Sequence, residues 1–235
     1  MTLLDLRQYR SLKSCSVDAH AFTRPSPPLR PGIAERLWDA SRVEFSVRGY
    51  HGARVQGIAR RAGCNVALLY RHWASKKALY LDVLRNVWQG ISGEVVALME
   101  QGRGAPAVVG AYLDAHLRDP VGAQILVREF LDGGPFFSQL VVAEPNLVEP
   151  VQRAARTIAS TEASEALRPG LDATMAVLSI GGLAALVASA HEAARPFFDQ
   201  PNPAEAWRRH LYDLLLHGVL ACPNTYPLSP TGGEG

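Results

Sequence analysis

The chain is poor in cysteine, and it has no long uninterrupted apolar run. Its three cysteines, Cys15, Cys64 and Cys222, lie too far apart to predict a disulfide framework. No segment reaches the roughly 18 consecutive apolar residues of a membrane span, and the first residues have too short an apolar stretch for a secretory signal. We therefore expect a chain that works in the reducing cytoplasm and does not enter a membrane.

One apolar segment, from Met175 to Ala190, comes nearest to a membrane span. Gly181 and Gly182 interrupt it, and His191 follows it directly. Small residues at such positions are typical of a helix that packs closely against another helix. We expect a buried helix here.

Motifs for catalysis, cofactor binding and metal binding are also absent. The sequence has no GxSxG, P-loop, HExxH or strand-linked GxGxxG pattern. Seven histidines are spread over the chain, and the one pair at helical spacing, His210 and His217, is two turns apart. No stretch alternates between apolar and polar residues as a strand would. We predict an all-α protein with no catalytic residues, no metal and no cofactor.

Charge is distributed unevenly along the chain. The 24 Lys and Arg residues nearly balance the 22 Asp and Glu residues. Residues 1–89, however, hold 15 of the basic residues and 6 of the acidic ones, a net charge of +9; the remainder holds 9 and 16, a net charge of −7. A basic region in front of an acidic body is typical of a protein that binds DNA with one end.

Two short helical patterns, one on each side of a glycine, lie between Arg54 and Lys76. In the first, apolar residues recur at i, i+3, i+4 and i+7 and predict one buried stripe: Val55, Ile58, Ala59 and Ala62. Gly63 follows as a left-handed helix stop, and Asn65 can cap a second helix. The pattern predicts a helix-turn-helix.

The second helix of this pair has an inner and an outer side. Leu69 and Trp73, four residues apart, point toward the first helix. The residues that remain on the outer side would meet a DNA major groove: Val66, Ala67, Tyr70 and Arg71.

The residues from Ile33 to about Val87 resemble the tetracycline-repressor (TetR) family of bacterial transcriptional regulators. The resemblance rests on the segments FSVRGYHG, VQGIARRAG and LLYRHWASKKAL. In the last segment, the family's pattern of aromatic, His, aromatic, Ser and Lys is matched by Tyr70, His72, Trp73, Ser75 and Lys76. The segment ALRPGLD, residues 166–172, is similar to the family's linker between its two last long helices.

The resemblance implies a set of DNA contacts and a mode of action. By resemblance Tyr70 and Lys76 contact the phosphate backbone, and His72 orients or touches it. The residues expected to contact DNA are Arg54, Gln56, Asn65, Val66, Ala67, Tyr70, Arg71, His72 and Lys76. The resemblance also implies a homodimeric repressor that binds a near-palindromic double-stranded DNA operator and releases it when an apolar small molecule binds.

Two departures from the family pattern alter these expectations. The family usually has Thr or Ser where Ala53 and Arg54 stand, so the first helix of the motif needs another cap. The second helix is unusually apolar, because Val66 and Ala67 can touch a thymine methyl group but cannot form bidentate hydrogen bonds. We therefore expect readout to depend on the few polar residues, above all Arg71, and on DNA shape.

The predicted organisation has four parts. Residues 1–30 form a disordered basic arm, 31–76 the helix-turn-helix domain, 77–221 a helical ligand-binding and dimerisation domain, and 222–235 a disordered tail. Within the third part, apolar spacing and breaks at Gly and Pro predict helices over residues 106–118, 121–131, 147–165, 172–195 and 204–221. The Gly- and Phe-rich segment after residue 131 is expected to be a loop.

Two sets of residues in the C-terminal half are candidate sites. An apolar effector pocket is expected among Met99, Tyr112, His116, Phe130, Phe136, Phe137, Met175 and His191. A dimer interface is expected in the helices at 147–165 and 172–195, through Val151, Ile158, Gly181, Ala184, Ala185 and Ala188. Taken alone, each pocket candidate is more often a core residue.

Two other functions stay open from the sequence. An all-helical enzyme or small-molecule carrier would bind a ligand and have no DNA function. A DNA-binding architectural or activating protein would have the same motif but a filled core. Replacement of Tyr70 and Lys76 by Ala separates a DNA binder from the first class, and a cavity among the C-terminal helices argues against the second.

Overall fold

The computed structural model of the chain describes residues 32–159, 167–168, 170–194, 196 and 203–219. These residues form ten α-helices and one 3₁₀ helix and contain no sheet, which confirms the predicted all-α class. In chain order the helices are α2 (Ile33–Gly52), α3 (Val55–Arg61), α4 (Val66–His72), α5 (Lys76–Glu100), α6 (Ala105–Arg118), α7 (Pro120–Leu131), α8 (Pro135–Ala143), η1 (Pro145–Val148), α9 (Glu149–Ala159), α10 (Ala173–Ala194) and α11 (Pro203–Val219). The predicted arm, 1–30, and tail, 222–235, lie outside the described residues.

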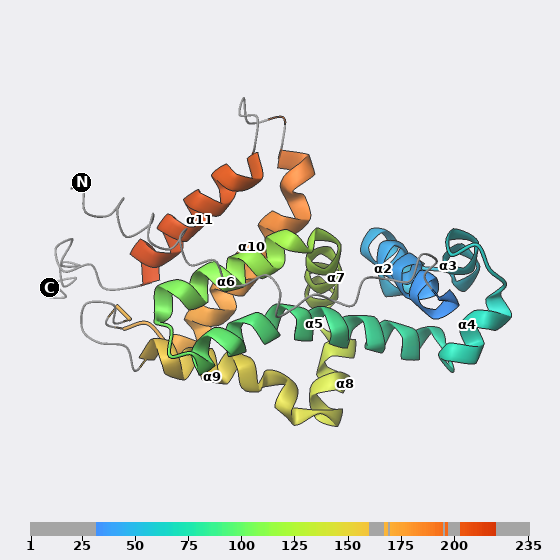
Figure 1. Ribbon diagram of the computed structural model, residues 1–235, viewed down its shortest axis with the longest axis horizontal. Coiled ribbons are helices and arrows are strands. Elements are labelled where there is room, and N and C mark those ends of the chain that lie inside the picture. Colours follow the sequence, from blue (N-terminus) through green and yellow to red (C-terminus); the bar gives the residue numbers. More distant parts are fainter. Residues whose placement is uncertain (1–31, 160–166, 169, 195, 197–202, 220–235) are drawn as a thin grey trace, which may run out of the picture.

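Helices α2, α3 and α4 form a small unit at one end of the molecule (Figure 1). In its core Leu37, Ile58 and Leu69 are fully buried, and Leu79 of α5 joins them. Helix α2 leaves helical geometry at Gly49, whose φ of 64° lies in the left-handed region, before helical structure resumes until Gly52.

The 25-residue helix α5 joins this unit to the rest of the molecule (Figure 1). Ser75 caps its start by accepting a hydrogen bond from the N–H of Ala78 (3.0 Å). One side of α5 is buried along its length, through residues that include Val83, Val87, Trp88, Ile91, Val95 and Met99. Because α5 packs against α2 and also against α6 and α9, it is part of both regions.

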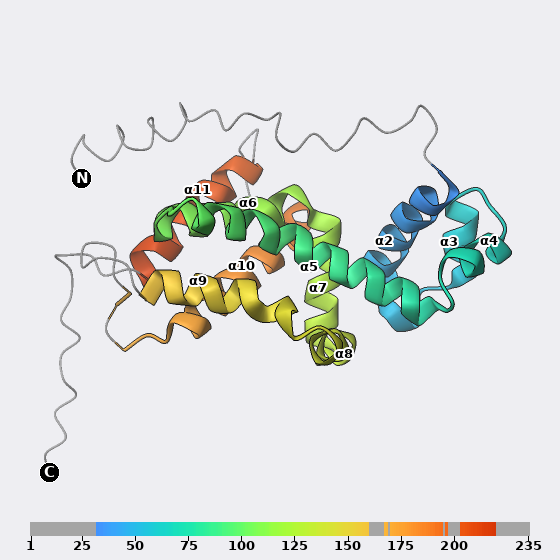
Figure 2. The same ribbon diagram turned by 60° about the horizontal axis from the view of Figure 1, so that its bottom comes forward.

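The larger region is a body of helices around α10, which contacts α6, α7, α9 and α11 (Figure 2). By length and composition α10 is the one described helix that could cross a membrane. Its inner face, however, is buried in the core through Val177, Ile180 and Ala184. The expectation of a buried helix therefore holds for the inner face alone, because Met175, Leu178 and Leu186 on the other face are exposed.

The segment between α7 and α9 corrects the prediction of a loop. Gly134 has a left-handed conformation (φ 69°) and precedes α8, and Pro135 occupies its first turn, where no N–H donor is needed. Phe136 and Leu140, four residues apart, are the buried face of this short helix. Gly and Pro therefore mark the start of a helix here and not an extended loop.

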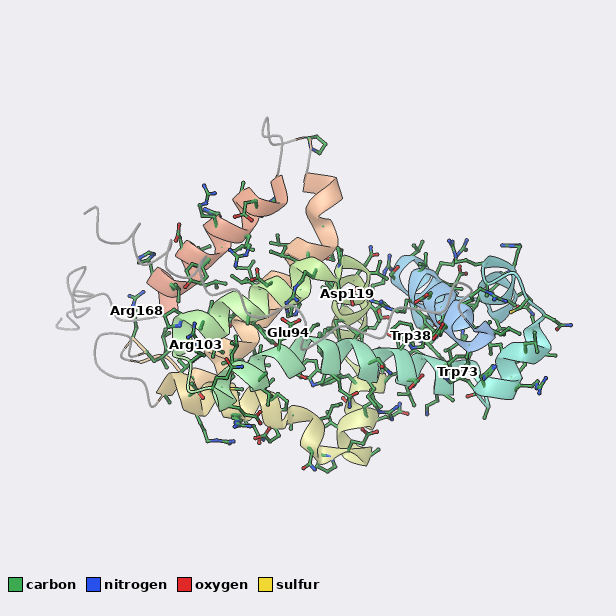
Figure 3. All side chains as sticks on the ribbon, in the orientation of Figure 1. Trp38, Trp73, Glu94, Arg103, Asp119 and Arg168 are labelled. Carbon is green, nitrogen blue, oxygen red and sulfur yellow. The ribbon has the colours of Figure 1, made fainter. Side chains whose placement is uncertain are left out.

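Contacts between α2 and α7 fasten the small unit to the body. Arg42 of α2 forms an ion pair with Asp119, which also caps the start of α7. Arg128 donates a hydrogen bond from Nε to the carbonyl oxygen of Ser46 (2.7 Å). Asp119, at the start of α7, and Trp38, in α2, mark this contact in Figure 3.

Candidate functional site

The turn between α3 and α4 is fixed by its own backbone. Gly63 has φ 64°, the N–H of Cys64 donates to the carbonyl oxygen of Ala59 (3.0 Å), and the N–H of Gly63 donates to that of Arg60 (3.2 Å). This pair of bonds around a left-handed glycine is the Schellman motif. The predicted glycine stop is confirmed.

Helix α4 begins with the predicted cap. The side chain of Asn65 accepts a hydrogen bond from the N–H of Ala67 (2.8 Å). Leu69, on the inner side of α4, is fully buried, whereas Tyr70 is 49% exposed. Local bonds between Ala59 and Ala67 therefore set both where α4 starts and which side it turns outward.

The start of α3 has a negative charge in place of the missing Thr or Ser cap. Arg54 gives no side-chain cap, but the carboxylate of Glu44 lies beside the first turn. A Cβ at Gly57 would come within 2.8 Å of Glu44 Oε1, so a larger residue there would displace the Glu44 carboxylate. A carboxylate is favourable beside the start of a helix, where N–H groups lack partners within the helix and the helix dipole is positive, and Glu44 also forms an ion pair with Arg48 (3.1 Å).

Most of the predicted DNA-contacting residues lie on one exposed end of the molecule. Helices α3 and α4 are at the end farthest from the body in both ribbon views (Figures 1 and 2). Seven of the nine predicted residues are exposed: Arg54, Gln56, Asn65, Ala67, Tyr70, Arg71 and His72. Val66 is half-buried. The exposed side chains provide the cationic and hydrogen-bonding groups that a phosphate backbone and base edges require.

Lys76, the ninth residue, is engaged within the protein. Its Nζ donates hydrogen bonds to the carbonyl oxygens of Tyr50 (2.8 Å) and Ala53 (3.0 Å). The same atom lies 4.4 Å from the centre of the Tyr50 ring. Trp73 is half-buried between α4 and α5 and donates from Nε1 to Asp82 (3.1 Å), which agrees with its predicted packing role.

A buried carboxylate that the sequence did not single out connects α5, α7 and α8. Glu129 accepts hydrogen bonds from the Tyr80 hydroxyl (2.9 Å) and from the N–H groups of Phe136 (2.7 Å) and Phe137 (2.9 Å). Burial and the nearby negative charge of Glu129 raise the pKa of Tyr80, so its hydroxyl stays protonated as the donor. In the sequence, Glu129 looks like any acidic residue of a helix.

The predicted pocket residues do not gather around one site. Met99, Tyr112 and His116 are buried in the body, and Phe136 packs instead against Tyr50 near the small unit, with ring centres 4.2 Å apart. Phe137 packs on Trp88 and on Phe130, whose side chain is 49% exposed, while Met175 is 67% exposed. The side chain of His191 lies outside the described part of the chain. The proposed lining is therefore corrected: of this set, Tyr112 alone borders the apolar cavity found in the body.

That cavity and a neighbouring groove lie on one side of α5. The cavity has a volume of about 10 Å³ and is lined by Trp88, Ile91, Ser92, Val95, Tyr112, Pro150, Val151, Ala154 and Val177. The groove has a volume of about 470 Å³ and is lined by Trp88, Gln89, Ser92, Ala143, Glu144, Pro145, Asn146, Leu147 and Pro150. They share Trp88, Ser92 and Pro150, so an apolar hollow adjoins a more polar one.

Tyr112 and His116 have structural protonation states. Burial lowers the pKa of His116, and its Nδ1 lies 2.8 Å from the carbonyl oxygen of Tyr112, so Nδ1 holds the proton of a neutral ring. Burial raises the pKa of Tyr112 to about 12. Neither group would exchange a proton at neutral pH. Among the residues that the structure describes, no three His, Cys, Asp or Glu side chains gather as metal ligands would.

The residues predicted for the dimer interface are buried within the subunit. Val151, Ile158, Gly181, Ala184, Ala185 and Ala188 all face the chain's own core. Gly181 lies directly against Tyr112, because a Cβ there would come 2.5 Å from the Tyr112 ring. The small residues of α10 thus permit close packing inside one subunit, and the assignment to an interface is corrected.

The opposite face of α10 is apolar and exposed. Met175, Leu178 and Leu186 of α10 recur at helical spacing and are 67%, 49% and 53% exposed, and Leu171, two residues before the helix, is 45% exposed. An exposed apolar stripe of this kind marks an interaction surface more often than a solvated face.

Comparisons with known proteins agree with this geometry. Residues 37–83 match the family model for bacterial regulatory proteins of the tetR family. The HTH-type transcriptional activator FasR of Mycolicibacterium smegmatis is 30% identical over 178 residues, which cover 72% of this chain and 74% of FasR.

Solved structures share the fold over most of the chain. The fatty acid degradation regulator FadR of Bacillus halodurans has a TM-score of 0.59 at 16% identity and covers 81% of this chain and 98% of its own. The transcriptional regulator FadR of Bacillus subtilis, solved in complex with stearoyl-CoA, has a TM-score of 0.53 at 15% identity, with 79% and 98% covered. Together with the exposed helix-turn-helix, these findings show that the chain belongs to the TetR family and is a DNA-binding transcriptional regulator, not an enzyme.

Proposed function

We propose that this protein is a repressor that binds a near-palindromic DNA site as a homodimer and leaves it when a largely apolar molecule binds the body. One observation carries the proposal: a single helix, α5, starts beside the exposed helix α4 and lines both the cavity and the groove further along. A change at the ligand end of α5 would therefore reach the DNA-binding end.

The DNA-bound state would place α4 in a major groove. Tyr70 and His72 would contact the backbone, and Arg71 would supply most of the base-specific hydrogen bonding. In a dimer the two copies of α4 would have to lie about 34 Å apart to enter successive grooves. Such an arrangement predicts two half-sites separated by about one turn of the DNA helix.

The exposed apolar face of α10 is the surface that we propose for dimerisation. A second copy of this face would cover Met175, Leu178 and Leu186, each of which is about half exposed or more in the isolated subunit. Burial of such side chains contributes about 1.5–3 kcal/mol each relative to full exposure. The proposed interface thus uses the opposite side of the helix from the one the sequence suggested.

The effector that fits the two hollows best is an amphiphile. The cavity is lined almost wholly by apolar side chains, and the groove beside it offers the side chains of Gln89, Glu144 and Asn146. An apolar tail in the cavity and a polar head in the groove would use both. Support comes from relatives whose names refer to fatty acid degradation and to stearoyl-CoA.

Entry of a tail would have to widen the space between α5 and the helices that face it across the cavity. A hollow of about 10 Å³ holds no more than one water molecule, so the helices that border it must separate. Val151 and Ala154 border it from α9, and Trp88 and Ile91 from α5. A coupling free energy of about 1–3 kcal/mol between the two sites would change DNA affinity 5- to 150-fold.

A binding experiment tests the proposal in two steps. Selection from a random duplex pool gives the bound sequence, which we expect to be near-palindromic; the affinity of the selected duplex is then measured with and without stearoyl-CoA as the probe. We expect at least fivefold weaker binding with the probe. No change with stearoyl-CoA, with free stearic acid or with an uncharged long-chain alcohol would contradict release by an amphiphile.

A pair of variants ties the response to the cavity. Ala154→Leu fills space at a buried position of α9 that lines the cavity, whereas Ala159→Leu adds the same atoms at an exposed position of the same helix. We expect the first variant to bind DNA but to lose its response to the probe, and the second to keep the response. An unchanged response in Ala154→Leu would place the ligand elsewhere.

Activation of transcription is a second candidate, because the relative FasR is named an activator. The same binding and release would then raise transcription when the protein is bound. A reporter gene behind the selected site separates the two, since deletion of the protein raises expression under repression and lowers it under activation.

A further inference from the structure

The hydroxyl group of Tyr112 has no hydrogen-bond partner, although the residue is buried. Tyr112 lies on α6, is 9% exposed and borders the apolar cavity of the body. Its backbone carbonyl oxygen lies 2.8 Å from Nδ1 of His116, but no residue that the structure describes bonds to its hydroxyl group. A buried polar group that has lost its bonds to water is unfavourable until it finds a partner. A ligand that supplied the partner would therefore be bound more tightly.

The other two polar side chains that line the cavity already use their donors. Trp88 donates from Nε1 to the carbonyl oxygen of Leu147 (2.7 Å). Ser92 donates from Oγ to the carbonyl oxygen of Trp88 (2.8 Å). Among the residues that line the cavity, Tyr112 is thus the one whose side-chain donor is unused.

Contacts on two sides hold the Tyr112 ring in place. A Cβ at Gly181 of α10 would come 2.5 Å from the ring and 2.8 Å from the hydroxyl oxygen, so the ring lies directly against the backbone of α10. The ring also packs edge to face on His116, with centres 4.9 Å apart. A side chain that is already fixed loses little conformational freedom when a ligand bonds to it.

The chemistry of the cavity limits the kind of group that can bond to this hydroxyl. Burial raises the pKa of Tyr112 to about 12, so the hydroxyl keeps its proton and can donate it. The residues that line the cavity include no Lys, Arg or His. A buried anion without a cation beside it is far less favourable than a neutral acceptor. The suitable partner is therefore a neutral oxygen, such as that of a keto, ester or hydroxyl group.

We propose that the effector carries a neutral oxygen within its apolar part and that Tyr112 recognises this oxygen by donating a hydrogen bond to it. This recognition rests on the binding of an amphiphile proposed above, and it adds a polar contact inside the cavity to that of the head group in the groove. A plain alkyl tail would leave the hydroxyl without a partner. Tyr112 is thus a specificity-determining residue, which favours an oxygenated tail over a plain one.

Calorimetric titration of the full chain with fatty acids of equal length tests this preference. The probes are stearic acid and a set of stearic acids that each carry one keto oxygen, at successive positions along the chain. We expect at least one keto acid to bind roughly two- to tenfold more tightly than stearic acid, the gain from one hydrogen bond. Tyr112→Phe should abolish the preference. Equal affinity of the wild type for all the probes, or a preference that Tyr112→Phe retains, would overturn the proposal.

Thermal unfolding distinguishes ligand recognition from a structural role. Because the Tyr112 hydroxyl has no partner in the protein, Tyr112→Phe should melt at the wild-type temperature or above it. Tyr80→Phe is the matched control: the Tyr80 hydroxyl donates to Glu129 (2.9 Å), so this variant should melt at a lower temperature and still prefer the keto acid. A lower melting temperature for Tyr112→Phe would show that its hydroxyl is bonded within the protein, and would overturn the proposal.

The same titration distinguishes failure of this recognition from failure of the proposed function. If no probe binds the wild-type chain, release by an amphiphile is wrong and recognition by Tyr112 is wrong with it. If stearic acid binds and weakens DNA binding, but no keto acid binds more tightly, the proposed function stands and recognition by Tyr112 alone is overturned.

Discussion

The small unit of α2–α4 and the larger helical body fix their functional surfaces in different ways. In the unit, the orientation of α4 follows from bonds between near neighbours, the Schellman motif at Gly63 and the Asn65 cap. In the body, the cavity is bordered by Trp88 of α5, Tyr112 of α6 and Val177 of α10, which are far apart in the chain. Local chemistry therefore specifies the DNA-binding end, and long-range packing specifies the ligand end.

The contrast extends to what is exposed. The unit turns polar and cationic side chains outward over a compact core, while the body buries its small residues and exposes an apolar face on α10. Between them lies a polar junction made of the Arg42–Asp119 ion pair and the buried carboxylate of Glu129. Because both regions share this junction, we expect substitutions there to alter the packing of both.

The largest effect is expected at Glu129. Glu129→Ala would leave the Tyr80 hydroxyl and two N–H groups of α8 without an acceptor, at a cost of about 3–5 kcal/mol in the free energy of unfolding. Glu129→Gln keeps one acceptor oxygen and should cost about 1–2 kcal/mol. Urea denaturation measures both values. Equal losses for the two variants would show that the hydrogen bonds do not hold α8 in place.

Arg71 tests the exposed end alone. Arg71→Ala should weaken binding to the selected duplex by about 1–3 kcal/mol and relax specificity at one base pair of each half-site, with stability unchanged. Arg103→Ala, which removes the same charge three residues beyond the far end of α5 (Figure 3), is the control and should have little effect. Equal losses in the two variants would mean that total charge, and not α4, determines binding.

A pair of glycines tests the claim that local backbone geometry shapes the unit. Gly63→Ala puts a side chain at φ 64° and should cost about 1–2 kcal/mol in stability. Gly90→Ala, on the exposed side of α5 where a Cβ would meet nothing within 4 Å, should stabilise by about 0.5–1 kcal/mol. Thermal unfolding of the two variants should thus shift in opposite directions, and a stabilising Gly63→Ala would contradict the account.

The smallest effect is expected in the pH dependence of stability, through His116 in the body. Because burial lowers the pKa of His116, the unfolded chain binds a proton more readily than the folded one as pH falls through 6.5. Stability should therefore decrease with falling pH below about 6.5, by at most about 1.4 kcal/mol per pH unit for this group. His116→Gln should flatten the dependence between pH 5 and 7, whereas exposed His217→Gln should not. A dependence that His116→Gln leaves unaltered would assign it to other groups.

The sequence predicts the small unit better than the body, because local bonds shape the unit and long-range packing shapes the body. The stop at Gly63 and the Asn65 cap are local signals, and the structure confirms both. The contacts of Lys76 within the unit have no such signal, because its side chain donates to carbonyl groups that lie more than 20 residues earlier.

In the body, residue type was a poor guide to location. Apolar and small residues suggested a pocket and an interface, but periodicity cannot tell which of two apolar faces of a helix turns inward. On α10 both faces are apolar, and Ala184 faces the core while Leu186 is exposed. Glu129 was missed because its role depends on the start of α8, whose N–H groups donate hydrogen bonds to it. The Gly-Gly-Pro segment before α8 had been interpreted as part of a loop, so no helix start was expected there.

The salt dependence of DNA affinity tests the central claim most directly. With about eight phosphate contacts per dimer, the log of the affinity for the selected duplex should fall against the log of salt concentration with a slope near −7. A slope of that size is expected if two copies of the exposed α3–α4 end contact the DNA phosphate backbone. A slope shallower than about −2 would contradict this mode of binding.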